Sequence, residues 1–235
     1  MTDEGYFQTN GEFVSHATIK TYNSLCGWAL YMFGEDTGDE RYMQAAVKAA
    51  EGAVRQQQPN GWIANNCLSD PSAPLLHTIG YTLQALLEIG TLARRPDLVE
   101  AAKRGAAPIV AQMPASGRLY GRYRADWTPG VQSVCLTGSA QLAIVLYGLA
   151  KFFDQPQWRE AADRIVDYLK AVQIVDSDDP GINGALAGSF PIFGEYMTGG
   201  YPNWATKYLL DALMLQETTL PLGNAVRGGS ALANG

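Results

Sequence analysis

The stretch FPIFGEYMTGGYPNWATKYLLDAL, residues Phe190–Leu213, shows the pattern that organises the whole chain. A loop rich in aromatic and polar residues runs directly into an apolar segment with helical spacing. The same order occurs in GWIANNCLSDPSAPLLHTIGYTLQALL at Gly61–Leu87 and in GRLYGRYRADWTPGVQSVCLTGSAQLAIVL at Gly117–Leu146. We therefore expect each loop to deliver side chains to the start of a helix, and a functional site where the three loops converge.

Apolar residues three and four positions apart predict helices that come in pairs. Alanines on the second helix of each pair repeat, because Ala45, Ala101 and Ala161 are 56 and 60 residues apart, a period typical of stacked helical units. The expected pairs are Ala17–Phe33, ending at Gly34, with Arg41–Gln57; Thr78–Ile89 with Leu98–Ala111; and Gly138–Phe153 with Trp158–Val172, followed by a single helix at Trp204–Gln216.

Each second helix runs into a glutamine followed by a glycine-containing turn, in QQPNGWI from Gln57, QMPASGRLYG from Gln112 and QIVDSDDPGINGALAGSF from Gln173. This pattern resembles the QW repeats of the terpenoid cyclase and protein prenyltransferase α/α-toroid superfamily. The resemblance implies inner and outer helices that alternate around a ring, with the active cavity where the inner helices begin. The expected fold is all-α, an α/α toroid or partial toroid of about three and a half helical hairpins, with an arm at 1–15, the toroid domain at 16–217 and a glycine-rich tail at 218–235.

Composition limits the classes of function. With 235 residues, 47% of them hydrophobic and 17% charged, the chain has enough apolar sequence for one sizeable core. A formal charge of −6 without a basic cluster argues against nucleic-acid binding. Three scattered cysteines lack zinc-site spacing, so we expect neither metal nor cofactor. We find no secretory leader and no apolar run of about 20 residues, and therefore expect a cytoplasmic protein without a membrane span. Seven helices are few for a closed toroid, so the expected ring is small, is incomplete, or is completed by a partner such as a second copy in a homo-oligomer.

The expected inner-helix starts and loops carry residues suited to a sugar. Aromatic rings stack on pyranose rings, whereas amides and cations bind hydroxyl and carboxylate groups, so the expected ligand is a small molecule or an oligosaccharide. The candidate binding residues are Lys20, Tyr22, Asn23, Asn65, Asn66, Arg122, Tyr123, Trp127, Gln141, Tyr196, Asn203, Trp204 and Lys207.

The main functional hypothesis is a carbohydrate-active enzyme that acts on an acidic, uronate-containing saccharide by lyase or epimerase chemistry. Such enzymes neutralise the substrate carboxylate and then remove the α-proton with Tyr, His or Lys. Several of these families use an α/α toroid, and the resemblance in residue types implies Arg122 or an amide for the carboxylate, with His77 and Tyr81 moving protons.

Three alternatives remain open. A glycoside hydrolase needs two carboxylic groups, for which Asp126 and Glu195 are the best pair. The toroid resemblance also implies an isoprenoid-binding or cyclising protein. A non-catalytic binding or scaffold module is the third alternative.

Several candidates also have a plain structural interpretation. His77 could cap or pack against its helix, Asp126 could cap its own turn, and Glu195 could pair with Lys207. Cys135, at a helix start, is either an activated thiol or a small buried side chain. The run Asp176–Asp179 matches the DxDD motif of terpene cyclases, but an acidic turn is the preferred interpretation. His16, at the edge of the arm, is expected to be structural or exposed.

Overall fold

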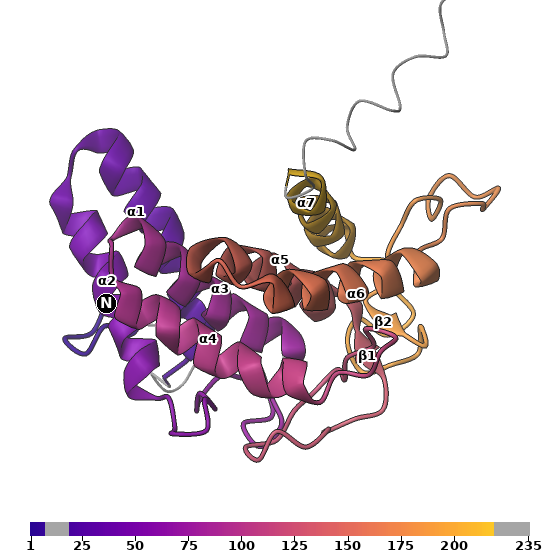
Figure 1. Cartoon of the computed structure of the whole chain (residues 1–235), viewed down its shortest axis with the longest axis horizontal. Helices are drawn as coiled ribbons and strands as arrows, with labels where there is room; N and C mark the ends of the chain where they lie inside the picture. The colour runs from indigo at the N-terminus through magenta and orange to yellow at the C-terminus, as the bar shows by residue number, and fades with distance from the viewer. Residues whose placement is uncertain (8–18, 219–235) are drawn as a thin grey trace, which may run out of the picture.

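The computed structural model describes residues 1–7 and 19–218 of the chain. Its helices in these ranges form three antiparallel hairpins and a single last helix (Figure 1). Two-residue strands β1 (Val134–Cys135) and β2 (Ser189–Phe190) pair antiparallel and join two of the long loops. The helices are α1 (Leu25–Thr37), α2 (Glu40–Arg55), α3 (Leu76–Leu92), α4 (Pro96–Ala111), α5 (Leu136–Phe153), α6 (Pro156–Val172) and α7 (Asn203–Thr218).

The odd-numbered helices form an inner row in which α1 packs on α3, α3 on α5 and α5 on α7. The even-numbered helices α2, α4 and α6 each pack behind the inner helix of their own hairpin (Figure 1). This arrangement is an arc of an α/α toroid, and its two ends are α1 and α7. The expected all-α partial toroid of three and a half hairpins is confirmed.

Residue choice explains the two layers. The inner helices α3 and α5 bury most of their residues, because they lie between neighbours in the row and outer helices behind it. The outer helices are amphipathic and turn small residues inward, such as Ala46 and Ala50 in α2 and Ala161 and Ala162 in α6. Alanine faces allow close helix approach without loss of rotamer entropy.

The start and end of the first expected helix were wrong. The described chain begins again at residue 19, a 3₁₀ turn covers Thr21–Ser24, and α1 continues through Gly34 to Thr37. Gly34 is buried where α1 meets α2, and a Cβ there would lie 2.7 Å from Cγ of Met43. The glycine therefore serves close packing, and the helix ends instead at Gly38, which has a left-handed φ of 70°. Pro96 and Pro156 begin α4 and α6 two residues earlier than expected.

A repeated contact, which we call the glycine joint, connects one unit to the next. Gly61 follows α2, has a positive φ, and lies against the carbonyl oxygen of Arg104 in the next outer helix, α4. Gly117, after α4, lies in the same way against the carbonyl of Arg164 in α6. Gly5, in the N-terminal arm, lies against the carbonyl of Lys48 in α2. No side chain fits between these backbones, so glycine is required at each joint.

Helix α5 is the one helix of the described residues whose length and hydropathy would allow it to span a bilayer. Most of that segment is buried inside the protein, as is typical of a core helix.

Candidate functional site

The loops that precede α3, α5 and α7 are held together at one end of the inner row. The backbone N–H of Leu76 donates to Gly121 O, and Leu75 forms a β-bridge with Arg122, which ties the loop before α3 to the loop before α5. Leu136 N–H donates to Gly188 O, which ties the start of α5 to the loop before α7. The expected convergence of the three loops is therefore present.

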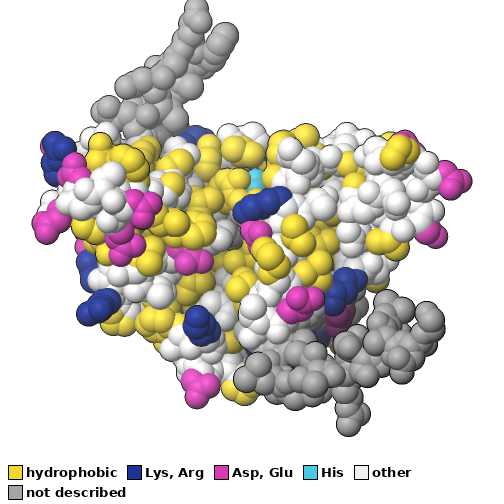
Figure 2. Space-filling view, turned by 90° about the horizontal axis from the view of Figure 1, so that it is seen from above, with side chains coloured by type: hydrophobic (Ala, Val, Ile, Leu, Met, Phe, Trp, Pro, Cys, Tyr) yellow, Lys and Arg dark blue, Asp and Glu magenta, His cyan; other side chains and the backbone are white. Residues whose placement is uncertain are grey.

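Four rings from these elements form an aromatic cluster: His77, Tyr81, Tyr196 and Tyr208. The centroid of the His77 ring lies 4.4 Å from that of Tyr81, 5.1 Å from that of Tyr196 and 6.4 Å from that of Tyr208. The Trp204 indole N–H donates to Tyr196 Oη at 2.9 Å and fixes that ring. Figure 2 shows hydrophobic side chains over much of one face of the molecule, with a histidine among them.

Gln141 fixes the orientation of His77. Its Oε1 lies 2.5 Å from His77 Nδ1, so the amide oxygen accepts and Nδ1 carries the proton. Nε2 of a neutral His77 is then left as the acceptor. Burial lowers the pKa of His77 and outweighs the opposing effect of the Gln141 contact, which keeps the ring neutral at pH 7.

Two tyrosines of the cluster, Tyr196 and Tyr208, are protonated at neutral pH. Burial raises the pKa of Tyr196 to about 12, and burial together with Tyr81 raises that of Tyr208 as well. Phenols of this kind donate hydrogen bonds and stack on sugars, but they are poor bases for removing a proton.

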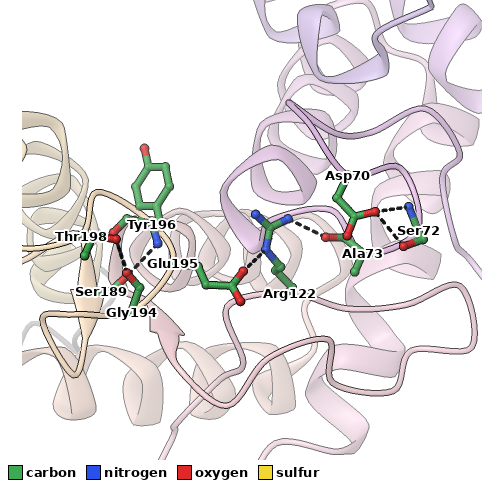
Figure 3. A network of polar contacts seen from close by, with 9 residues as sticks. All are labelled: Asp70, Ser72, Ala73, Arg122, Ser189, Gly194, Glu195, Tyr196 and Thr198. Carbon is green, nitrogen blue, oxygen red and sulfur yellow. Dashed lines mark hydrogen bonds and ion pairs between the residues drawn. The ribbon is translucent and has the colours of Figure 1, made fainter.

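An ion pair borders the cluster. The Arg122 Nε–H donates to Glu195 Oε2 at 2.7 Å, and its NH1 donates to the carbonyl of Ala73 at 2.8 Å (Figure 3). The Arg122 side chain is 12% exposed, whereas that of Glu195 is 55% exposed. The guanidinium is thus fixed, while the carboxylate lies at the surface.

Glu195 precedes Tyr196 on a loop with its own internal bonds. Ser189 Oγ donates to Tyr196 O at 2.7 Å and accepts from Tyr196 N–H at 3.0 Å, and Thr198 Oγ1 donates to Gly194 O (Figure 3). These bonds hold Tyr196 in the cluster and leave the Glu195 side chain to reach Arg122. The structural alternative in which Glu195 pairs with Lys207 was wrong, because Lys207 pairs with Asp211 at 2.7 Å.

Asp126, Trp127 and Tyr123 occupy the neighbouring loop. Asp126 Oδ1 accepts from both the backbone N–H and the hydroxyl of Thr128, so it caps its own exposed turn. Trp127 packs edge-on to Trp62, and the centroids of the two rings are 5.3 Å apart. Tyr123 is fully buried, and its hydroxyl oxygen accepts a hydrogen bond from the Tyr120 N–H. None of the contacts found in the described residues joins these three side chains to the aromatic cluster.

The remaining candidates lie in two groups. Lys20 donates to Cys67 O, Asn65 donates to Gln56 Oε1, and the buried Asn66 accepts from Thr82, so these residues brace the loop between α2 and α3. Tyr22 and Asn23 belong to the turn before α1. At the other group, Asn203 begins α7, Trp204 is 40% exposed beside Tyr196, and Lys207 lies 4.5 Å from the Tyr208 ring centroid.

Sequence reasoning missed Tyr208. It lies one turn after Trp204 on α7, and the i, i+4 spacing from a candidate residue could have found it. Cys135 is fully buried, which raises the pKa of its thiol to about 12 although the backbone N–H of His77 and the Arg122 charge oppose the shift. The buried, unreactive interpretation of this thiol fits the structure.

Other motifs have simple placements. Asp179 Oδ1 accepts from Gly181 N–H in an exposed turn, as preferred for the acidic run Asp176–Asp179. His16 lies outside the described residues. Among residues 1–7 and 19–218, three or more His, Cys, Asp or Glu side chains do not gather as they would around a metal ion.

No protein-family model matches the chain, and no curated protein matches it. Solved structures do. The unsaturated glucuronyl hydrolase of Bacillus sp. GL1, responsible for the degradation of glycosaminoglycan, is 21% identical with a TM-score of 0.72 over 90% of this chain and 63% of that one. The fold is an α/α toroid. An unsaturated glucuronyl hydrolase specific for heparin is 15% identical, with a TM-score of 0.73 over 91% of this chain and 63% of that one.

A third neighbour is an α-1,6-mannanase of Salegentibacter sp. HEL1_6, solved with α-1,6-mannotriose as a variant inactivated at two aspartates. It is 18% identical with a TM-score of 0.68 over 92% of this chain and 60% of that one. This chain therefore spans only about 60% of the length of these similar structures. They are named as sugar hydrolases, and the expected link to terpenoid cyclases finds no counterpart among them.

Proposed function

We propose that the protein is a carbohydrate-active enzyme that hydrolyses a uronate-containing saccharide at the aromatic cluster. The observation that carries this proposal is the Arg122 guanidinium, which is only 12% exposed, fixed by the Ala73 carbonyl and paired with a carboxylate at the border of a cluster of rings. A guanidinium held in this way can bind the carboxylate of a ligand through two parallel hydrogen bonds once Glu195 moves away from Nε.

The residues around it have complementary roles in the proposal. Tyr81, Tyr196 and Trp204 provide faces for a sugar ring, and His77 Nε2 accepts from a sugar hydroxyl. Glu195 is the carboxylate beside the cluster and is the proposed proton donor or acceptor in glycosidic cleavage.

We favour hydrolysis over the lyase or epimerase chemistry expected from the sequence. The similar solved structures support this preference, because two of them are named as glucuronyl hydrolases and a third as an α-1,6-mannanase. We assign Asp126 no role in this scheme, since Thr128 engages its carboxylate in a separate turn.

A mass measurement separates the two chemistries. Incubation with unsaturated glucuronyl N-acetylgalactosamine 6-sulfate, the kind of disaccharide bound to one similar hydrolase, is expected to yield two products whose summed mass exceeds that of the substrate by one water molecule. A lyase cleaves without adding water. The variant Glu195→Gln is expected to lose turnover by about 100-fold, whereas Asp97→Asn, which breaks an ion pair on the outer helix α4, should not.

Non-catalytic saccharide binding is the second candidate. It is favoured because hydrolysis ordinarily uses two carboxyl groups, and the expected partner of Glu195, Asp126, is engaged by Thr128 in a separate turn. Saturable binding of the disaccharide by calorimetry, with no product after prolonged incubation, would establish this function instead.

A further inference from the structure

Arg118 is a second fixed guanidinium at the loop end of the arc. Its Nη2 donates to the carbonyl oxygen of Gln132, and its Cζ lies 5.0 Å from the centroid of the Tyr120 ring. Arg122 pairs with Glu195, whereas no carboxylate in the described part of the chain pairs with Arg118. A guanidinium has five N–H donors, and the contact with Gln132 uses one of them. Arg118 therefore has a fixed position and keeps donors for a ligand.

Two further aromatic rings lie next to this guanidinium. The glycine joint at Gly117 holds the preceding backbone against Arg164 of α6, and Tyr168 follows Arg164 by about one helical turn. Burial raises the pKa of Tyr168, and the nearby Arg118 charge opposes this shift. Phe190 is 45% exposed and packs edge-on to Tyr168, with the ring centroids 6.5 Å apart. We call this surface the Arg118 site, and its members are Arg118, Tyr120, Tyr168 and Phe190.

The ribbon of β1 and β2 separates the Arg118 site from the aromatic cluster. Successive side chains of a strand point to opposite faces. Ser189 Oγ bonds with the backbone of Tyr196, which belongs to the cluster, whereas Phe190 contacts Tyr168 of the outer helix α6 beside the ribbon (Figure 1). The Arg118 site therefore lies on the α6 side of the ribbon and is distinct from the site around Arg122.

We propose that the Arg118 site binds the carboxylate of an acidic sugar, separately from the aromatic cluster. Arg118 donates to the carboxylate, and the exposed Phe190 ring packs against the sugar. A uronate has both features, since its carboxylate is attached directly to a ring with apolar C–H faces. A bare anion would contact the guanidinium and leave the aromatic rings unused. The choice of a sugar as the carrier of the carboxylate rests on the proposed function, whereas the fixed guanidinium does not.

An NMR titration observes both sites at once. In protein with isotope-labelled arginine, the Nε–H signals of Arg118 and Arg122 are assigned by their loss in Arg118→Lys and Arg122→Lys. We expect methyl glucuronide to shift the Arg118 signal saturably and methyl glucoside to leave it unchanged. Acetate should need a concentration about 10-fold higher, because it has no ring to pack on Phe190.

The two signals distinguish failure of this proposal from failure of the proposed function. No saturable shift at Arg118, or equal affinity for acetate and methyl glucuronide, would overturn the second site. A shift at Arg122 alone would also overturn it and would leave the proposed function intact. A shift at Arg118 alone would support the second site and count against acidic-sugar binding at the cluster.

Replacement of Phe190 separates a role in ligand binding from a role in packing. We expect Phe190→Leu to weaken binding of methyl glucuronide at the Arg118 signal by about 5-fold, because the aromatic face is lost. The matched control is Phe152→Leu in the last turn of α5, a phenylalanine of similar exposure at 40%, which should not change the Kd. A lower urea midpoint for Phe190→Leu with an unchanged Kd would show a packing role alone and contradict the proposal.

Discussion

At the scale of single residues, the site is defined by what each polar group is bonded to. His77 is held neutral by burial and oriented by Gln141, while Arg122 is held by a carbonyl and a carboxylate. The sequence named His77, Tyr81, Arg122, Gln141, Glu195, Tyr196 and Trp204, which lie together. Sequence reasoning also counted Trp127 and Asp126 as site candidates. Residue type alone does not show that the Trp127 indole packs within the loops or that the Asp126 carboxylate caps its own turn.

Protonation of His77 should lower the free energy of unfolding as the pH falls. The folded state lowers the pKa of His77 below its ordinary 6.5, so the unfolded chain takes up the proton first as the pH falls below that value. The contribution is fully present above pH 6.5 and is lost as the pH falls towards the lowered folded pKa. Urea midpoints at pH 7.5 and 5.0 should show a smaller difference for His77→Gln than for the wild type. Equal differences would contradict the assignment.

Arg122 should affect acidic ligands selectively. Replacement by Met removes the charged hydrogen-bond donors, each worth about 1.5–3 kcal/mol, so the Kd for methyl glucuronide should rise by roughly 10-fold or more. Calorimetry with methyl glucoside provides the comparison, since this neutral sugar has no carboxylate for Arg122. A similar loss for both sugars would point to a general collapse of the loop.

At the scale of elements, the register between α3 and α5 sets the distance between His77 and Gln141. Gly138 permits this register, because a Cβ there would lie 2.5 Å from the backbone nitrogen of His77 and 2.6 Å from the carbonyl carbon of Leu76. Helical periodicity predicted both helices, but it does not reveal which glycine meets a neighbouring backbone. Likewise, the sequence predicted a helix end at Gly34, whereas in the structure this glycine allows α1 to pack closely against α2.

Gly138→Ala should therefore destabilise the protein by about 2–3 kcal/mol, since backbone atoms cannot move aside as a side chain can. Gly148→Ala, further along α5, meets the end of the flexible Leu87 side chain and should cost less, under about 1 kcal/mol. Urea unfolding of both variants tests the contrast. A Gly138→Ala protein as stable as Gly148→Ala would disprove the argument.

At the scale of the whole molecule, the alanine period and the recurring glutamine and glycine turns were enough to predict a toroid arc. The sequence did not reveal the repeated glycine joint, because glycine is common in turns and its contacts with a neighbouring backbone are not visible in the sequence. The N-terminal side of the arc has its joint filled by Gly5, whereas α7 at the C-terminal side presents the exposed Leu210 and Met214. The expected homo-oligomer remains a proposal.

Protection from hydrogen exchange should follow position in the arc. In stacked units stability comes from neighbours, and α3 and α5 have neighbours on both sides whereas α1 and α7 have one inner neighbour each. Amides of α3 and α5 should exchange more slowly than those of α1 and α7, by about 10-fold or more. Mass spectrometry of peptic fragments measures these exchange rates. Uniform protection across the four helices would contradict the prediction that local stability depends on position in the arc.

The ion pair between Arg122 and Glu195 also bears on how an acidic ligand would reach the site. With its cation already neutralised by Glu195, the site offers little long-range attraction, and a carboxylate would bind by replacing Glu195 at short range. Association rates of acidic sugars should then change little between low and high ionic strength, in contrast to binding steered by an open positive patch. Glu195→Gln would uncover the guanidinium charge, and stopped-flow measurements on that variant should show a salt dependence that the wild-type protein lacks.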